Sequence, residues 1–106
     1  MFTSLLLGGR NRELAAHVAS HLRTGLDGYT IVEELDAIPA TLRGLHPDNP
    51  VNRPRQAGVQ IELPPRVRGL GPFWDDRRAE WVDGRAPHTE ALIAALAAAA
   101  ADWPRT

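Results

Sequence analysis

The pattern of apolar and polar positions at the start of the chain predicts a strand followed by a helix. Residues 2–7 form an apolar run that ends in two glycines, which is typical of a strand buried on both faces of a helix-covered sheet. Residues 12–24 place apolar side chains at helical spacing, with Asn11 suited to cap this helix and Gly25 to end it. A second strand over 30–35 would complete a strand, helix, strand unit with a right-handed crossover.

The middle of the chain predicts a polar loop that leads into a third strand. Residues 36–43 favour one or two helical turns. Residues 44–56 contain three prolines together with Asn, Asp and Arg, a composition that excludes regular structure. Residues 59–63 then alternate apolar with polar, so Gln60 and Glu62 are expected on one face of a strand and the apolar residues on the other.

The last third of the chain predicts a helix over 89–103. Thr89 can cap it, and the alanine run at 97–101 favours helix without needing a functional explanation. Upstream, the sequence predicts a turn over 69–72 and a short helix within 73–82. The expected buried stripe of the last helix consists of Leu92, Ile93, Leu96 and Trp103.

Length and composition indicate an ordinary small globular protein. The 106 residues fit one domain, and a net charge of −1 gives no reason to expect nucleic acid or an anionic membrane as partner. No cysteine is present, which excludes a disulfide framework, a thiol nucleophile and a thiolate zinc site. The first apolar run is too short for a signal peptide or a membrane span, so we expect a cytoplasmic protein.

The loop and the third strand carry the residues best suited to chemistry. Glu62, near the end of a strand, can act as a general base if a cleft desolvates it, although a solvated edge glutamate is the commoner situation. Asn49, Asn52 and Arg53 offer amide donors and a guanidinium, which can hold a substrate carboxylate. Turn-capping asparagines and a surface arginine would explain the same residues equally well.

The histidines and the glycine pair favour structural explanations. His17 and His21 are four residues apart on the predicted helix, a spacing that can bind zinc, but no Glu follows His17 and both border the apolar stripe. We therefore expect no metal ligand in this chain. Gly8-Gly9 lacks the patterns of a nucleotide-binding loop, which makes a nucleotide site an unfavoured interpretation.

Two segments resemble the poly-gamma-glutamate hydrolase family, which includes proteins labelled phage-related replication protein. The first is Gly-Leu-His-Pro-Asp-Asn-Pro-Val-Asn-Arg at 44–53, and the second is Ala-Gly-Val-Gln-Ile-Glu-Leu at 57–63, followed by Val67-Arg68. Leu-Leu-Leu-Gly-Gly at 5–9 is similar to a segment that precedes this signature in the family. The resemblance covers roughly residues 3 to 68.

This resemblance implies an α/β fold: part of a three-layer α/β/α domain of the zinc carboxypeptidase kind (phosphorylase/hydrolase-like), with a mixed sheet. It implies a zinc-bound water that attacks an amide. Glu62 matches the general base of that chemistry, Asn52 and Arg53 would grip the carboxylate of a glutamyl substrate, and Asn49 would shape the loop.

The chain departs from the family pattern in one important respect. The family's zinc ligands lie in an N-terminal half with histidine motifs that this sequence does not contain, and Pro64-Pro65 replace a usual Ser-Arg. We expect residues 1–106 to be the C-terminal portion of a hydrolase domain, inactive when alone, with zinc ligands from a missing N-terminal half. A split enzyme with a partner chain and a non-catalytic remnant are the competing explanations. The alternative function is a small binding module for an anionic ligand or a partner protein.

Overall fold

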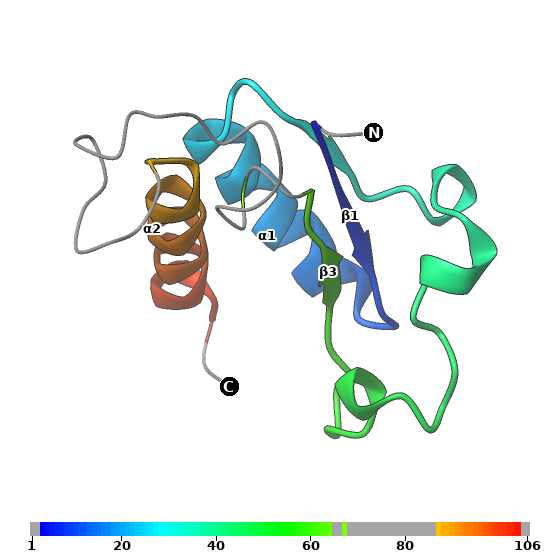
Figure 1. The fold of residues 1–106 in the computed structure, drawn as a ribbon. Coiled ribbons are helices and arrows are strands. Elements are labelled where there is room, and N and C mark those ends of the chain that lie inside the picture. The colour runs from blue at the N-terminus through cyan, green and yellow to red at the C-terminus, as the bar shows by residue number, and fades with distance from the viewer. Residues whose placement is uncertain (1–2, 65–66, 68–86, 105–106) are drawn as a thin grey trace.

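The fold is built on a three-stranded mixed sheet of order β2-β1-β3 (Figure 1). The computed structural model describes residues 3–64, 67 and 87–104. The central strand β1 (Ser4–Gly8) runs parallel to β2 (Thr30–Val32) and antiparallel to β3 (Gln60–Glu62). The three predicted strands are therefore confirmed, with the second and third shorter than expected.

The two faces of the sheet are buried to different degrees. Leu5 and Leu7 of β1 are fully buried, whereas Ser4 and Leu6, which point to the opposite face, are only partly buried. The prediction that this strand is buried on both faces was wrong for the described residues, because no described helix lies over the Leu6 face.

Helix α1 (Arg12–Gly25) covers the Leu5 and Leu7 face of the sheet, as the apolar spacing predicted. Its first turn is capped by Asn11, whose side-chain oxygen accepts a hydrogen bond of 3.0 Å from the backbone N–H of Leu14. The buried side of the helix consists of Ala15, Val18, Ala19 and Leu22. Packing of these residues on the strand leaves the opposite side of α1 polar and exposed.

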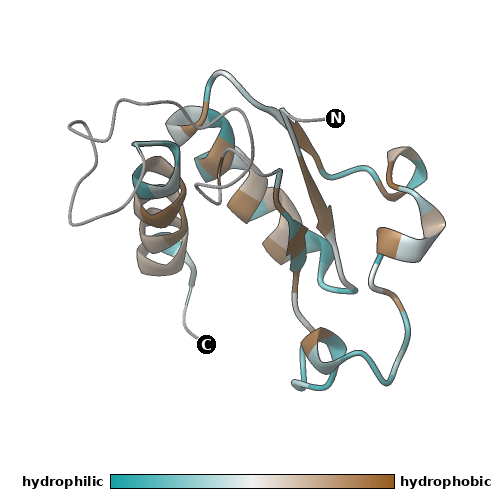
Figure 2. Ribbon diagram, viewed as in Figure 1, coloured by the Kyte–Doolittle hydropathy of each residue, from teal (hydrophilic) through white to brown (hydrophobic). Residues whose placement is uncertain are grey.

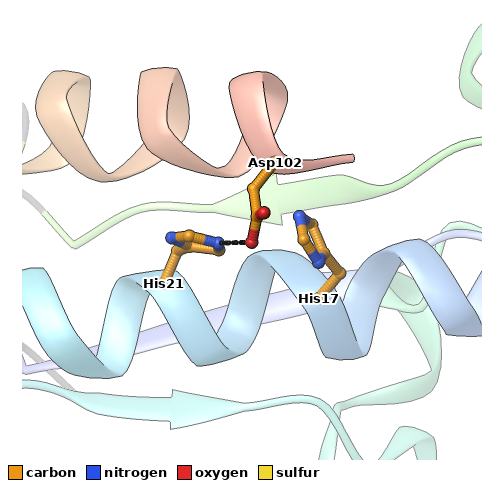
Figure 3. Close-up of side chains that lie close together, drawn as sticks. All are labelled: His17, His21 and Asp102. Atoms are coloured by element: carbon orange, nitrogen blue, oxygen red, sulfur yellow. Dashed lines mark hydrogen bonds and ion pairs between the residues drawn. The ribbon is translucent and has the colours of Figure 1, made fainter. Parts of the chain in front are cut away.

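Helix α2 (Pro87–Asp102) lies beside α1 on the same side of the sheet (Figures 1 and 3). Its buried residues are Leu92, Ala95 and Ala99, whereas Ile93 is 44% exposed. The predicted stripe was therefore wrong in part. Small alanines face α1 because the two helices approach closely: a Cβ placed at Gly25 would lie 3.1 Å from the Cβ of Ala95.

Thr89 does not cap α2 as predicted, since it lies inside the helix. Its hydroxyl instead donates a hydrogen bond of 2.5 Å to the backbone oxygen of Val67, a fully buried residue that follows β3. This contact ties the start of α2 to the end of the sheet segment.

Three short 3-10 helices connect the strands: η1 (Leu35–Ala37), η2 (Ala40–Leu42) and η3 (Pro50–Asn52). The first two confirm the helical turns predicted for 36–43. The turn predicted over 69–72 and the short helix predicted within 73–82 lie outside the described residues.

The outer strand β2 is joined to α1 by Arg23. Its guanidinium forms an ion pair with Glu33 at 2.6 Å and also donates to the backbone oxygen of Ile31 at 3.0 Å. In the parallel register, Thr30 and Val32 direct their backbone groups toward β1, so the Ile31 carbonyl points away from the sheet.

The architecture confirms the predicted α/β class with a mixed sheet, of which the described residues supply the sheet and one layer of helices. Apolar residues are concentrated along β1 and on the facing sides of the helices, and the loops are largely hydrophilic (Figure 2). Within the described ranges, no helix has the length and apolar character needed to cross a bilayer.

Candidate functional site

Glu62 lies on the face of the sheet that points away from α1. It is directly opposite Leu6 of β1, while its neighbour Ile61 is opposite the buried Leu7. Cross-strand partners share a face, so the register confirms that Gln60 and Glu62 project together on the Leu6 side. Glu62 is partly buried, and no group of the described residues donates a hydrogen bond to its carboxylate.

Asn49 is brought to the same strand by a hydrogen bond to Gln60. Its amide nitrogen donates to Oε1 of Gln60 at 2.9 Å, and its own oxygen accepts from the backbone N–H of Val51 at 3.1 Å. Side chains two residues apart on a strand are separated by about 6–7 Å, which is the spacing between Gln60 and Glu62 along β3. The structure therefore connects the loop to the proposed base through Gln60, a residue that sequence reasoning placed on the correct face but did not assign to the site.

Asn52 holds the loop together. Its amide donates to the backbone oxygens of Gly44 and His46, at 2.7 and 2.9 Å, and its oxygen accepts from the backbone N–H of Arg10 at 3.0 Å. Both amide hydrogens are used by these contacts. Substrate binding by Asn52 stays a prediction, and its hydrogen bonds favour a role in supporting the loop.

The glycine pair at the end of β1 is required by the close approach of neighbouring backbone segments. A Cβ at Gly8 would lie 2.3 Å from the backbone oxygen of Arg43, and a Cβ at Gly9 would lie 2.3 Å from that of Gly58. Gly9 also has a φ of +92°, a conformation that favours glycine. These contacts explain Gly8-Gly9 without a phosphate-binding role.

Arginine side chains give the loop a positive character. Arg53 and Arg55 are exposed, and neither guanidinium forms a hydrogen bond or an ion pair within the described part of the chain. Arg10 is exposed too and uses its Nε to donate to the backbone oxygen of Leu45 at 2.7 Å. Among the described residues, Arg53 makes no ion pair with Glu62.

A polar hollow lies where the parallel strands β1 and β2 end. It has a volume of about 300 Å³ and is lined by Arg12, Glu33, Glu34, Leu35 and Asp36. Arg12 donates to the backbone oxygens of Leu7, Gly9 and Glu33, so its guanidinium is used to join β1 to β2. These bonds give the arginine a structural role that the sequence did not indicate.

The surroundings of Glu62 do not fit a zinc ion by themselves. Across residues 3–64, 67 and 87–104, the group of three possible metal-ligating side chains that lie close together is His17, His21 and Asp102. This group lies between α1 and α2 (Figure 3). Glu62 shares a face with Leu6, whereas α1 covers the opposite face of the sheet. Histidine or carboxylate partners for a metal at Glu62 would have to come from outside the described residues.

Comparison with protein families gives one match. The family model described as poly-gamma-glutamate hydrolase matches residues 1–79, which include the whole sheet, α1 and the loop, but not α2. Comparison with curated proteins and with solved structures returns no match.

Proposed function

Because the chain belongs to the poly-gamma-glutamate hydrolase family, we propose that it takes part in the hydrolysis of gamma-glutamyl amide bonds, with Glu62 as the general base. The observation that supports this role is the position of Glu62: it is partly buried, it receives no hydrogen bond from the described residues, and it lies on the strand to which the arginine-containing loop is joined through Gln60.

The proposed reaction needs one proton to be moved twice. Glu62 accepts a proton from a water molecule whose oxygen bonds to the amide carbon. The carbon–nitrogen bond then breaks, and the same proton passes to the leaving nitrogen, which gives a free amine and a free gamma-carboxylate. A single carboxylate can serve as base and then as acid in this sequence.

The arginines of the loop suit the charge of the substrate. In a gamma-linked polymer every residue keeps its alpha-carboxylate, so the chain presents one negative charge per unit. A guanidinium can bind such a carboxylate through two parallel hydrogen bonds. We assign Arg53 to this contact, with Asn49 orienting the loop through Gln60 and Asn52 fixing its other end. Arg55 is an exposed neighbour of the same charge.

Zinc dependence is part of the proposal, with its ligands supplied by another polypeptide segment. The described residues provide no group of metal ligands at Glu62. His17 and His21 belong to α1, which covers the opposite face of the sheet. On this view residues 1–106 alone bind substrate weakly and do not hydrolyse it.

Reconstitution tests this function. The purified chain would be mixed with zinc and gamma-linked polyglutamate, alone and together with the N-terminal half of a family member, and newly formed amines would be counted. Alpha-linked polyglutamate serves as the linkage control. We expect cleavage of the gamma-linked polymer only in the mixture of both halves. Tight polymer binding by the lone chain without zinc, and no cleavage in any mixture, would instead support the binding-module function.

A further inference from the structure

We propose that His17, His21 and Asp102 form a site for a divalent transition-metal ion of the zinc class, which clamps α2 to α1. One possible ligand atom from each residue lies within 4.8 Å of the other two, and Figure 3 shows the three side chains converging between the helices. The sequence alone offered only the histidine pair. Asp102, 81 residues from His21 in the sequence, is the third possible ligand, and the fold brings it to the histidines.

The helix geometry explains why these three residues meet. His17 and His21 are one turn apart on α1 and therefore project from the same side. Asp102 is the last residue of α2, and the close packing of Ala95 and Ala99 on α1 holds that end of the helix near the histidines. The convergence depends on the main interface between the helices and not on a mobile loop.

The distances are close to those that a metal ion requires. Zinc bonds of about 2.0–2.1 Å in a tetrahedral arrangement separate neighbouring ligand atoms by roughly 3.4 Å. Nε2 of His21 and Oδ2 of Asp102 are already 3.3 Å apart. The Asp102 side chain is 71% exposed, so it can adjust toward His17 without disturbing the core, and a water molecule can take the fourth position.

The surroundings orient the first histidine and favour a cation. Nε2 of His17 lies 2.9 Å from the backbone oxygen of Ala99, and its ring meets that of Trp103 edge to face at 5.0 Å. Binding through Nδ1 would keep the contact with Ala99, which is the usual way in which a second ring nitrogen orients a metal-bound histidine. The carbonyls of the last turn of α2, which have no partner within the helix, add partial negative charge near the site.

This site is separate from the proposed hydrolytic chemistry. Glu62 lies on the Leu6 face of the sheet, whereas α1 covers the opposite face. Asp102 also lies outside residues 1–79, so the family match does not include the complete set of ligands. The clamp therefore stabilises the association of the helices, and it holds or fails independently of the function proposed above.

Metal titration of the full chain tests the clamp. Zinc affinity would be measured by calorimetry, and cobalt(II) would be used for its visible absorption, whose bands distinguish tetrahedral from octahedral coordination. We expect equimolar binding, a tetrahedral cobalt spectrum and a rise in the unfolding temperature on adding zinc. His21→Gln and Asp102→Asn should each weaken zinc binding at least about 10-fold. Loss of a residue that only orients a metal ligand already lowers metal affinity by about 10-fold or more, and loss of a ligand itself should cost at least as much.

The control is the double variant His46→Gln, Asp48→Asn, which removes the same residue types from an exposed pair 4.0 Å apart. It should bind zinc like the unmodified chain. Circular dichroism in the presence of a chelator checks that each variant is folded, and the exposed Asp102 gives a variant that leaves the core intact. Equal affinity of the control and the Asp102 variant, an octahedral spectrum, or a stoichiometry of one metal per two chains would overturn the proposal. In that case the His21–Asp102 contact is an ion pair only.

Discussion

The side-chain amide of Asn49 donates a 2.9 Å hydrogen bond to Oε1 of Gln60, so the polar loop is fixed to the strand that carries Glu62. The same asparagine caps η3 through Val51. One residue thus sets both the shape of the loop and its attachment to β3.

Asn49→Ala should lower the free energy of unfolding by about 1–2 kcal/mol, since it removes a cap and a side-chain hydrogen bond. Urea denaturation would measure the loss. In a double-mutant cycle with Gln60→Ala, we expect a coupling energy of about 0.5–1.5 kcal/mol. Gln56→Ala, at an exposed position of the same loop, is the control and should change stability by less than about 0.5 kcal/mol. Additive effects at 49 and 60 would contradict the link.

Gly9→Ala should destabilise the protein by more than about 1–2 kcal/mol, because the new Cβ would collide with the Gly58 carbonyl and the backbone is left-handed. The matched control is Gly28→Ala, where a Cβ meets nothing within 4 Å. That variant should be neutral or more stable by up to about 1 kcal/mol. Thermal unfolding of both variants would measure the difference. Similar melting temperatures would contradict the close approach of the Gly58 backbone to Gly9.

Arg12→Lys should cost about 1–3 kcal/mol of stability even though the charge is kept. A lysine cannot reproduce the planar fork that donates to the backbone oxygens at positions 7, 9 and 33. Arg55→Lys, whose side chain is exposed and unbonded within the described residues, is the control and should differ from the parent by less than about 0.5 kcal/mol. Equal denaturation midpoints for the two variants would rule out this role for Arg12.

Glu62→Gln should lower kcat in an active reconstituted mixture by about 10²–10⁴-fold, because the amide cannot accept the proton from water. KM should change little, since Arg53 and the loop still bind the substrate. Glu13→Gln, an exposed position on α1, provides the control and should leave kcat unchanged. Unchanged turnover in the Glu62 variant would remove the base from the proposal.

The sequence predicted the elements that depend on local patterns. Asn11 caps α1 as expected because capping involves residues three positions apart, and the alternation at 59–63 placed Glu62 on the correct face because strand period is a local property. Prediction from the sequence failed where a residue distant in the chain determines the contact. Thr89 was expected to be a cap, but it bonds Val67, a partner that no local pattern specifies.

The helix interface shows the same limit. Hydrophobicity alone favoured Ile93 for the buried side of α2, but close approach to α1 selected the smaller Ala95 and Ala99. For the site, the residue types at 49, 52 and 53 could be read from the sequence, whereas the hydrogen bonds that occupy Asn52 and bring Gln60 to Asn49 could not. Asp102 near His21 had no signal in the sequence, since only the packing of the helices brings them together.

The contact between Arg23 and the outward-facing Ile31 carbonyl has a consequence for solubility. Edge strands with free backbone groups invite pairing with other molecules, and a charged side chain placed along the edge is one way in which proteins discourage it. With Glu33 holding the guanidinium in place, this edge of the described sheet offers one backbone acceptor fewer to an added strand. A short hydrophobic strand can thus remain at the border of this small sheet without recruiting further copies of itself.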